Sequence, residues 1–247
     1  ETNISAHQTL VETLLTAVTG NDVNSAESIA LLFANFDSLF TTENSVDQLK
    51  QTILQLAVMG KLVPQDPNDE PASVLLEKIA AEKEKLVKEK KIKKQKALPP
   101  IGDEEKPFEL PVGWEWCFLS DITAIVTDGD HQAPPKSDSG VPFLVIGNLN
   151  TGRVDFRGCR YVPVESFDAL DWGSKPKKGD LLDTVTGSYG IPVTINSNEE
   201  FCVQRHVAIL KACKSSPMHY LTRALAAQYA YEYATLIATG IAQKTVP

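Results

Sequence analysis

The stretch LPPIGDEEKPFELPVGWEWCF, residues 98–118, separates two kinds of pattern in this chain of 247 residues. Before it, apolar residues recur at the three- and four-residue spacing of amphipathic helices. After it, short β-rich runs are punctuated by glycine, proline and asparagine. Its two leading prolines end the helical pattern, and the alternation of Trp114, Trp116 and Phe118 predicts a strand that enters a sheet. We therefore expect a helical region followed by a β-containing domain.

Three helices are predicted at the start of the chain. The first has an apolar face and is expected to begin near Ser5 and end at Gly20. The second is expected to begin at Ser25, and the third begins with a capping-box spacing, Ser45-x-x-Gln48. Amphipathic helices joined by short polar turns favour a helical bundle or hairpin.

A connector with three prolines, residues 62–71, precedes a fourth predicted helix. This helix is expected from about Ala72 into the lysine-rich run, with Leu75, Ile79 and Leu86 on one apolar stripe. Because the stripe is short, it favours packing against one partner helix over a self-sufficient coiled coil.

Charge is unevenly distributed along the chain. The formal net charge of −8 argues by itself against a nucleic-acid partner. Residues 1–75 carry a net charge of −8, residues 76–100 carry +5, and residues 101–247 carry −5. Local patches, and not the sum over the chain, set the affinity for DNA. The run KEKKIKKQK, residues 88–96, is interpreted first as a solvated helix end, with phosphate contact as the alternative.

The C-terminal part predicts a compact, irregular domain. Strands are expected at residues 122–126, 141–146, 160–164, 180–185, 192–195 and 203–210. One helical region follows, with apolar or aromatic residues four apart at Leu221, Leu225, Tyr229, Tyr233 and Ile237. The predicted fold class is α+β: a helical region (helix bundle or long helix) at residues 1–100 and a mixed α/β domain with an irregular twisted β-sheet at residues 101–247.

Several other kinds of protein find no support in the sequence. Without a membrane-length apolar run or a basic, apolar leader, a cytoplasmic protein is expected. The four cysteines are irregularly spaced and are expected to be reduced and mostly buried. Cys202, His206 and Cys213 lack the spacing of a zinc site. No Walker A, nucleophile-elbow or methyltransferase signature is present, so no catalytic site is expected in this chain.

Two long stretches, residues 48–100 and KPFELPVGWEW at residues 106–116, carry a resemblance to a known family. Shorter motifs continue it in order: TDGDHQAPP at 127–135, GVPFLVIGN at 140–148, KGDLL at 178–182, TGSYG at 186–190, QRHVA at 204–208 and TGIAQ at 239–243. In this combination the chain resembles type I restriction enzyme specificity subunits over nearly all of residues 45–247. The order of the motifs carries the resemblance, because no single motif is diagnostic.

The resemblance implies a DNA-reading subunit with no catalysis of its own. Such subunits carry two target-recognition domains, each reading half of a split site in double-stranded DNA. Paired helices separate the two domains and dock the modification subunits, and through them the restriction subunits. S-adenosylmethionine, ATP and Mg²⁺ are expected in those partners, and no cofactor in this chain. Residues 1–100 would be the spacer, dimerisation and docking region, and residues 101–247 one recognition domain, either the second or the first of a longer protein.

A DNA-reading domain needs cations and amides for phosphates, forked donors or acceptors for base edges, and loops that enter a groove. The candidates lie in polar loops: His131, Gln132, Lys136, Asn148, Asn150, Arg153, Ser188, Tyr189, Arg205 and Lys244. Each loop also has a structural interpretation, such as an Asp-Gly turn, a hairpin turn or a bulged strand connection. On a single strand at 203–210, Arg205 would face away from His206 and would be the better DNA candidate.

Two other functions stay open on the sequence alone. One is a protein-binding adaptor without direct DNA readout, and the other is a self-contained DNA-modifying enzyme. Binding of S-adenosylmethionine by the isolated chain would favour the enzyme. An unchanged target site after exchange of residues 107–240 would favour the adaptor.

Overall fold

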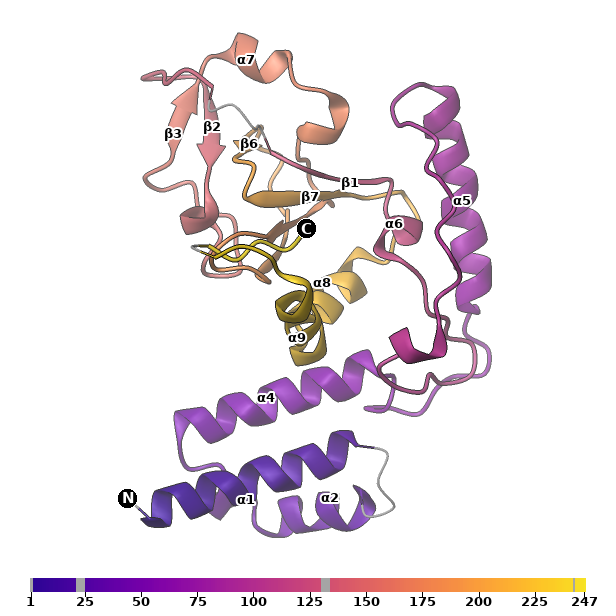
Figure 1. Cartoon of the computed structure of the whole chain (residues 1–247), viewed down its shortest axis with the longest axis vertical. Coiled ribbons are helices and arrows are strands. Elements are labelled where there is room, and N and C mark those ends of the chain that lie inside the picture. The colour runs from indigo at the N-terminus through magenta and orange to yellow at the C-terminus, as the bar shows by residue number, and fades with distance from the viewer. Residues whose placement is uncertain (1, 21–24, 130–133, 242) are drawn as a thin grey trace. The chain divides into compact units, whose positions relative to one another are not determined.

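The chain forms two compact units, Glu1–Asp66 and Pro67–Pro247 (Figure 1). A computed structural model describes residues 2–20, 25–129, 134–241 and 243–247. The compact units therefore divide after the third long helix, whereas the sequence predicted a change of region at residue 100. The cause is the helix at residues 72–88, which packs on the C-terminal domain. The functional roles assigned to residues 1–100 and 101–247 stay predictions.

The first unit is helical, as predicted. It contains α1 (Thr2–Thr19), α2 (Ser25–Ala34), α3 (Phe36–Leu39) and α4 (Glu43–Val58) (Figure 1). Helix α1 packs against both α2 and α4. The apolar face predicted for α1 is confirmed, because the core of this unit consists of Val11, Leu15, Val18, Leu32 and Leu39.

The starts of two helices differ from the predicted ones. The N-cap of α4 is Thr42, whose hydroxyl accepts from Ser45 N at 3.1 Å while Ser45 Oγ accepts from Thr42 N at 3.2 Å. Ser45 is therefore the inner partner of the capping box and not the cap, because Thr42 offers the same three-residue spacing one turn earlier. Helix α1 begins at Thr2, which places Ser5 inside it.

The second unit begins with α5 (Ala72–Lys88), which Pro71 precedes as the N-cap. The stripe predicted on this helix is confirmed as a packing face, since Ile79 is fully buried and Leu75 and Leu86 are partly buried. Its face packs on the C-terminal domain, including Ala124, Cys213 and the short helix α6 (Leu119–Ile122). The predicted pairing with a second long helix stays a prediction.

The remaining helices of this unit are short. They are α6 (Leu119–Ile122), α7 (Val164–Asp168), α8 (Met218–Ala226) and α9 (Gln228–Ile237), with 3₁₀ helices η1 (Asp103–Glu105), η2 (Ile146–Asn148) and η3 (Trp172–Ser174). The predicted C-terminal helical region is confirmed as two helices, which are separated at Ala227, where ψ is 150° and the chain is extended. Because of this break, α8 packs on strand β5 of the sheet, and α9 takes a different direction from α8.

Two small sheets replace the single sheet that the sequence predicted, and the α+β class is confirmed. The antiparallel four-stranded sheet has the order β1 (Ile125–Asp128), β7 (Val207–Lys211), β4 (Leu181–Thr184), β5 (Pro192–Thr194). The three-stranded sheet has the order β3 (Arg160–Val162), β2 (Val141–Leu144), β6 (Cys202–Val203), with β2 and β6 parallel.

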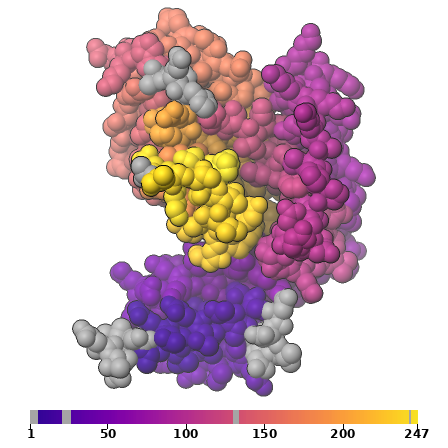
Figure 2. All heavy atoms as spheres, in the orientation of Figure 1, coloured from indigo at the N-terminus to yellow at the C-terminus, as the bar shows by residue number. Residues whose placement is uncertain are grey.

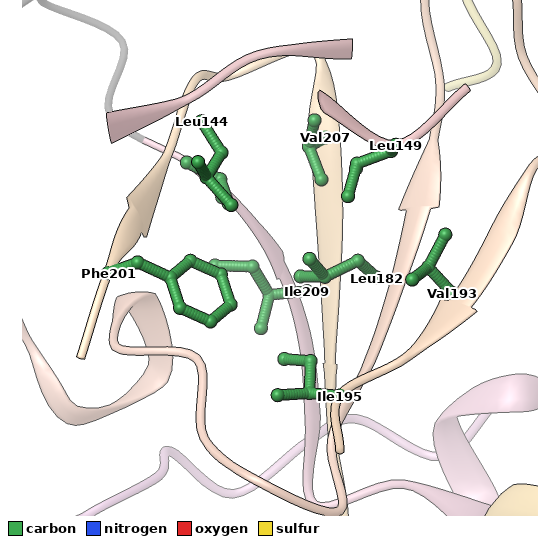
Figure 3. Packing of buried hydrophobic residues seen from close by; sticks show 9 residues of the cluster. Leu144, Leu149, Leu182, Val193, Ile195, Phe201, Val207 and Ile209 are labelled. Atoms are coloured by element: carbon green, nitrogen blue, oxygen red, sulfur yellow. The ribbon is translucent and has the colours of Figure 1, made fainter. Parts of the chain in front are cut away.

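The two sheets share one apolar core (Figure 3). Leu144 of β2 and Phe201 before β6 meet Leu182, Val207 and Ile209 of the larger sheet, and all are almost fully buried. At roughly 25 cal/mol per Å² of apolar surface, burial of such side chains is the main source of stability in this unit. The loops that leave the strands are therefore carried by a packed, rigid base.

The strand predicted at Trp114–Phe118 is not present. This segment runs as irregular chain and is held by its rings, with Trp116 4.8 Å from Phe108 and Trp114 5.6 Å from Tyr220 between ring centroids. Large aromatic side chains can bury their surface against helices without joining a ladder, so the alternation misled the prediction.

Candidate nucleic-acid interface

Strand ends bring several polar loops together at one end of the four-stranded sheet. Asp128, where β1 ends, pairs with Ala208, and Thr184, where β4 ends, pairs with Val207 at the start of β7. We call this end the loop edge and include residue 129 and residues 185–190, 204–206 and 243–246, which adjoin it.

Gly129 holds the chain after β1 close to the start of β7. Its N–H donates to Val207 O at 3.2 Å, and a Cβ at this position would lie 2.1 Å from Val203 O. Because no side chain fits so close to backbone, only glycine allows this approach. The predicted reading loop therefore starts beside residues 203–207. Two candidates of that loop, His131 and Gln132, lie outside the described residues.

Residues 204–206 form a turn and not part of a strand. Val207 N donates to Gln204 O at 3.0 Å, which closes the turn, and β6 and β7 lie on either side of it. The predicted continuous strand at 203–210 was wrong, so the strand alternation does not apply. Arg205 is exposed in this turn, with Nε donating to His206 Nε2 at 3.3 Å.

The TGSYG loop lies between this turn and the C-terminal segment. Val185 N donates to His206 O at 3.0 Å, and Val246 N donates to Val185 O at 2.9 Å. Gly187 N donates to Lys244 O at 2.9 Å, which ties the loop to residues near the end of the chain. Ser188 and Lys244 are exposed, and Figure 2 shows the C-terminal segment, in yellow, on the surface of the second unit.

Tyr189 in the same loop is not available to a sugar or base in this structure. Its hydroxyl donates to Thr235 Oγ1 at 3.0 Å, and its ring stacks on Tyr231 with 5.4 Å between centroids. The side chain is buried between the loop and α9. This packing gives Tyr189 a role in positioning the loop, and its predicted DNA contact stays a prediction.

Two asparagines on the loop after β2, Asn148 and Asn150, differ in burial and in hydrogen bonding. Asn148 is buried, its Oδ1 accepts from Val145 N at 3.0 Å, and its Nδ2 donates to Asp155 O at 2.9 Å. The bonds use the amide to close the loop, which gives Asn148 a structural role, and its predicted base contact stays a prediction. Asn150 and Arg153 are exposed on the same loop and keep their predicted roles.

Lys136 is exposed but belongs to a different part of the domain. Its neighbour Ser137 donates from its backbone N–H to Tyr161 O at 3.0 Å, which places it beside β3. Of the described candidates, Ser188, Arg205 and Lys244 lie on segments that hydrogen bonds join at the loop edge. The described contacts do not join Lys136 to that group.

Sequence comparisons identify relatives of the chain. No family model matches the sequence. Over 164 residues the chain is 56% identical to the EcoAI specificity subunit of a type I restriction enzyme from Escherichia coli, a match that covers 66% of this chain and 28% of that subunit. Over 130 residues it is 62% identical to the EcoEI specificity subunit from the same organism, covering 52% and 22%. The chain is a relative of type I specificity subunits. The resemblance drawn from the motifs is thus confirmed.

The chain spans about a quarter of the length of the curated proteins that it matches. A chain from a solved structure, described as a study of complex assembly and conformational transition of the type I R-M system, aligns with 19% identity and a TM-score of 0.35. That alignment covers 76% of this chain and 43% of the other. A TM-score this low does not establish a common fold.

Asp183 is a titratable group at the loop edge that sequence reasoning missed. Burial raises its pKa to about 7, against a smaller opposite effect of the Thr184 backbone amide, and its Oδ1 has no hydrogen-bond partner. It pairs across the sheet with Ala208, one residue from the end of β4. Below this pH the carboxyl is neutral and adds no negative charge to this part of the sheet. The acidic residue inside the apolar run LLDTV was the available signal.

Two charged groups on the loop after β2, Asp155 and Arg157, form an ion pair. The Arg157 guanidinium and the Arg157 backbone N–H both donate to the Asp155 carboxylate, and these hydrogen bonds lower the pKa of Asp155 to about 2. Arg157 is a further exposed cation that sequence reasoning missed. Within the described ranges, His, Cys, Asp and Glu side chains form no group of three or more that could hold a metal ion. In the same ranges, no helix is long and apolar enough to cross a membrane.

Proposed function

We propose that this chain is part of the DNA-reading subunit of a type I restriction-modification complex. In this proposal residues 101–247 read one half of a bipartite double-stranded DNA target, and the helical region holds this reader apart from a second one. The observation that carries the proposal is the identity of 56% and 62% to two type I specificity subunits.

The loop edge supports this function physically. Arg205 and Lys244 offer cations on neighbouring loops, and Ser188 offers a hydroxyl between them. A guanidinium can pair with a guanine edge or a phosphate, and an ammonium binds phosphate as a point charge. Arg153 and Asn150 extend the polar surface on the loop after β2. These are the side-chain types that phosphate positioning and base readout require.

The charge distribution supports a division of labour with partner subunits. Residues 101–247 carry a net charge of −5, so this domain alone would bind DNA weakly. We therefore assign much of the phosphate contact to the modification subunits and to the second recognition domain. Methylation with S-adenosylmethionine, and cleavage and translocation with ATP and Mg²⁺ in the restriction subunits, would belong to those partners in the cytoplasm. This chain would contribute no catalytic group.

A domain exchange tests the proposal. Residues 67–247, the compact unit that includes α5, are replaced in the full-length specificity subunit by the matching unit of a relative with another target. After assembly with the modification subunits, mapping of methylated adenines is expected to show a change in one half of the target and none in the other. An unchanged target would support the protein-binding adaptor. Calorimetric binding of S-adenosylmethionine to this chain alone would support the self-contained enzyme.

A further inference from the structure

Helix α5 is attached to the recognition domain by a carboxylate clamp, formed by Glu82 and the turn at residues 213–216. The Glu82 carboxylate accepts from Lys214 N at 2.6 Å, from Ser215 N at 3.1 Å and from Ser215 Oγ at 2.5 Å. One carboxylate therefore binds two successive backbone amides and a hydroxyl. Hydrogen bonds to an ionised acceptor are directional and about twice as strong as neutral ones.

The rest of the α5 interface is mainly apolar. Ile79 is fully buried against Ala124 and Cys213. Lys83, next to Glu82, donates to Ser120 O, and burial lowers its pKa. Apolar burial holds a helix against a surface but is non-directional, so it permits sliding and tilting. The clamp adds three directional bonds to the one that Lys83 makes, and these bonds fix the orientation of the helix on the domain.

The clamped turn is connected to the loop edge by a single strand. Strand β7 (Val207–Lys211) ends two residues before this turn and begins directly after the turn that exposes Arg205. It is paired on both sides, with β1 and with β4. Ser216 Oγ also donates to Ile122 O at 2.6 Å, which fastens the clamped turn to α6. A strand inside a sheet therefore connects the turn that Glu82 binds with the turn that carries Arg205.

We propose that Glu82 is a positioning residue that fixes the angle between α5 and the loop edge, and thereby the spacing accepted between the two half-sites. This inference rests on the proposed function, in which helices separate two readers. Without the clamp, α5 stays attached through Ile79 and Lys83 but loses three of its directional bonds and gains freedom to tilt. The reader at the far end of the helical region then accepts a wider range of distances between half-sites.

The test compares Glu82→Ala and Glu82→Gln with Glu84→Gln, an exposed glutamate on the same helix. Each variant is made in the full-length specificity subunit and assembled with its modification subunits. One readout is hydrogen exchange at the Lys214 and Ser215 amides. The other is methylation of DNA in which the native half-sites are separated by the native number of base pairs, or by one more or one fewer.

For Glu82→Ala, exchange at the two amides is expected to accelerate about tenfold or more, since charge-assisted bonds are lost. Its preference for native over shifted spacing is expected to fall roughly fivefold. Glu82→Gln retains a weaker acceptor and is expected to lie between Glu82→Ala and the parent, while Glu84→Gln matches the parent.

Faster exchange with an unchanged spacing preference would overturn the inference, because Glu82 would then be only structural. If Glu82→Ala does not assemble, the ratio of methylation at native and shifted spacing is measured for Glu82→Gln, and an unchanged ratio would overturn the inference. Failure of the proposed function is a separate result: the parent complex itself would then methylate without dependence on the half-site that this domain reads.

Discussion

The two ends of the four-stranded sheet differ in whether their cationic side chains are buried or exposed. At the end where β7 stops, Lys211 is fully buried and its Nζ donates to Asp180 Oδ2 at 2.6 Å and to Lys175 O at 2.7 Å. At the loop edge, where β7 starts, Arg205 and Lys244 are exposed. One strand, β7, therefore has a buried, hydrogen-bonded cation at its end and an exposed cation in the turn before its start.

The difference indicates which end of the sheet stabilises the domain and which end is available to contact DNA. A buried ion pair adds little net stability, but it is intolerant of any change in geometry, since a lost partner leaves a charge without compensation. The loops at the other end have constrained positions, such as Gly129 and Tyr189, but Ser188, Arg205 and Lys244 are exposed and can vary without disturbing packing. One end of the strand therefore anchors the domain, and the other presents side chains to a partner. Substitutions at the two ends should differ accordingly.

The largest effect is expected for Lys211→Met. The change leaves the Asp180 carboxylate buried without its cation, which costs about 3–5 kcal/mol of the free energy of unfolding. Urea denaturation followed by fluorescence measures this loss. Lys178→Met, at an exposed lysine two residues before Asp180, is the matched control and should change stability by less than about 0.5 kcal/mol. If both variants lose the same free energy of unfolding, the proposed difference between the buried and the exposed lysine would be wrong.

A pH-dependent effect is expected at Asp183. Its pKa is about 7 in the folded protein, above the value of about 3.9 for an unfolded chain. Between these values the folded state holds a proton that the unfolded state has released, so stability falls as pH rises through this window and the full cost is reached above about pH 7. The upper bound of this cost is roughly 4 kcal/mol.

Asp183→Asn removes the charge and keeps the shape of the side chain. Its stability relative to the parent is therefore expected to increase between pH 5 and pH 8, as measured by urea denaturation at several pH values. Asp138→Asn, at an exposed aspartate, serves as the control. A constant difference between Asp183→Asn and the parent across this range would contradict the burial of a neutral carboxyl.

A smaller effect is expected to separate Asn148 from Asn150. Asn148→Ala removes bonds that close the loop and leaves Val145 N and Asp155 O without their partner, at a cost of about 1–3 kcal/mol. Asn150→Ala should leave stability unchanged and reduce methylation of the native target by the assembled complex. Thermal unfolding and methylation are measured on both variants, and the reverse pattern would show that the assignment of the two residues is wrong.

The smallest effect on folding is expected at the exposed cations. Arg205→Gln and Lys244→Gln should each change the free energy of unfolding by less than about 0.5 kcal/mol. If each side chain contacts a phosphate, the slope of log affinity against log salt for the assembled complex falls by about 1 per variant. Arg223→Gln, at an exposed arginine of α8, is the control. An unchanged slope would exclude a phosphate contact at that position.

The sequence was sufficient where one local rule decides the structure. The apolar periodicity of α1, the prolines of the connector and the short apolar strands each depend on neighbouring residues only. The order of the motifs was likewise enough to indicate the family. These features share a cause, because hydrophobic spacing and backbone restriction act within about one or two turns of chain.

The tertiary structure decided every feature in which the partner of a residue is distant in the sequence. Glu82 gave no signal on its helix, since the amides it binds belong to residues 214 and 215. Lys211 and Asp180 form an ion pair only because β7 and β4 are neighbours. Asn148 and Tyr189 were predicted as DNA contacts, and packing made them supports of their loops. Composition indicates that a polar side chain will find a partner, and only the packed chain determines whether that partner is the protein itself.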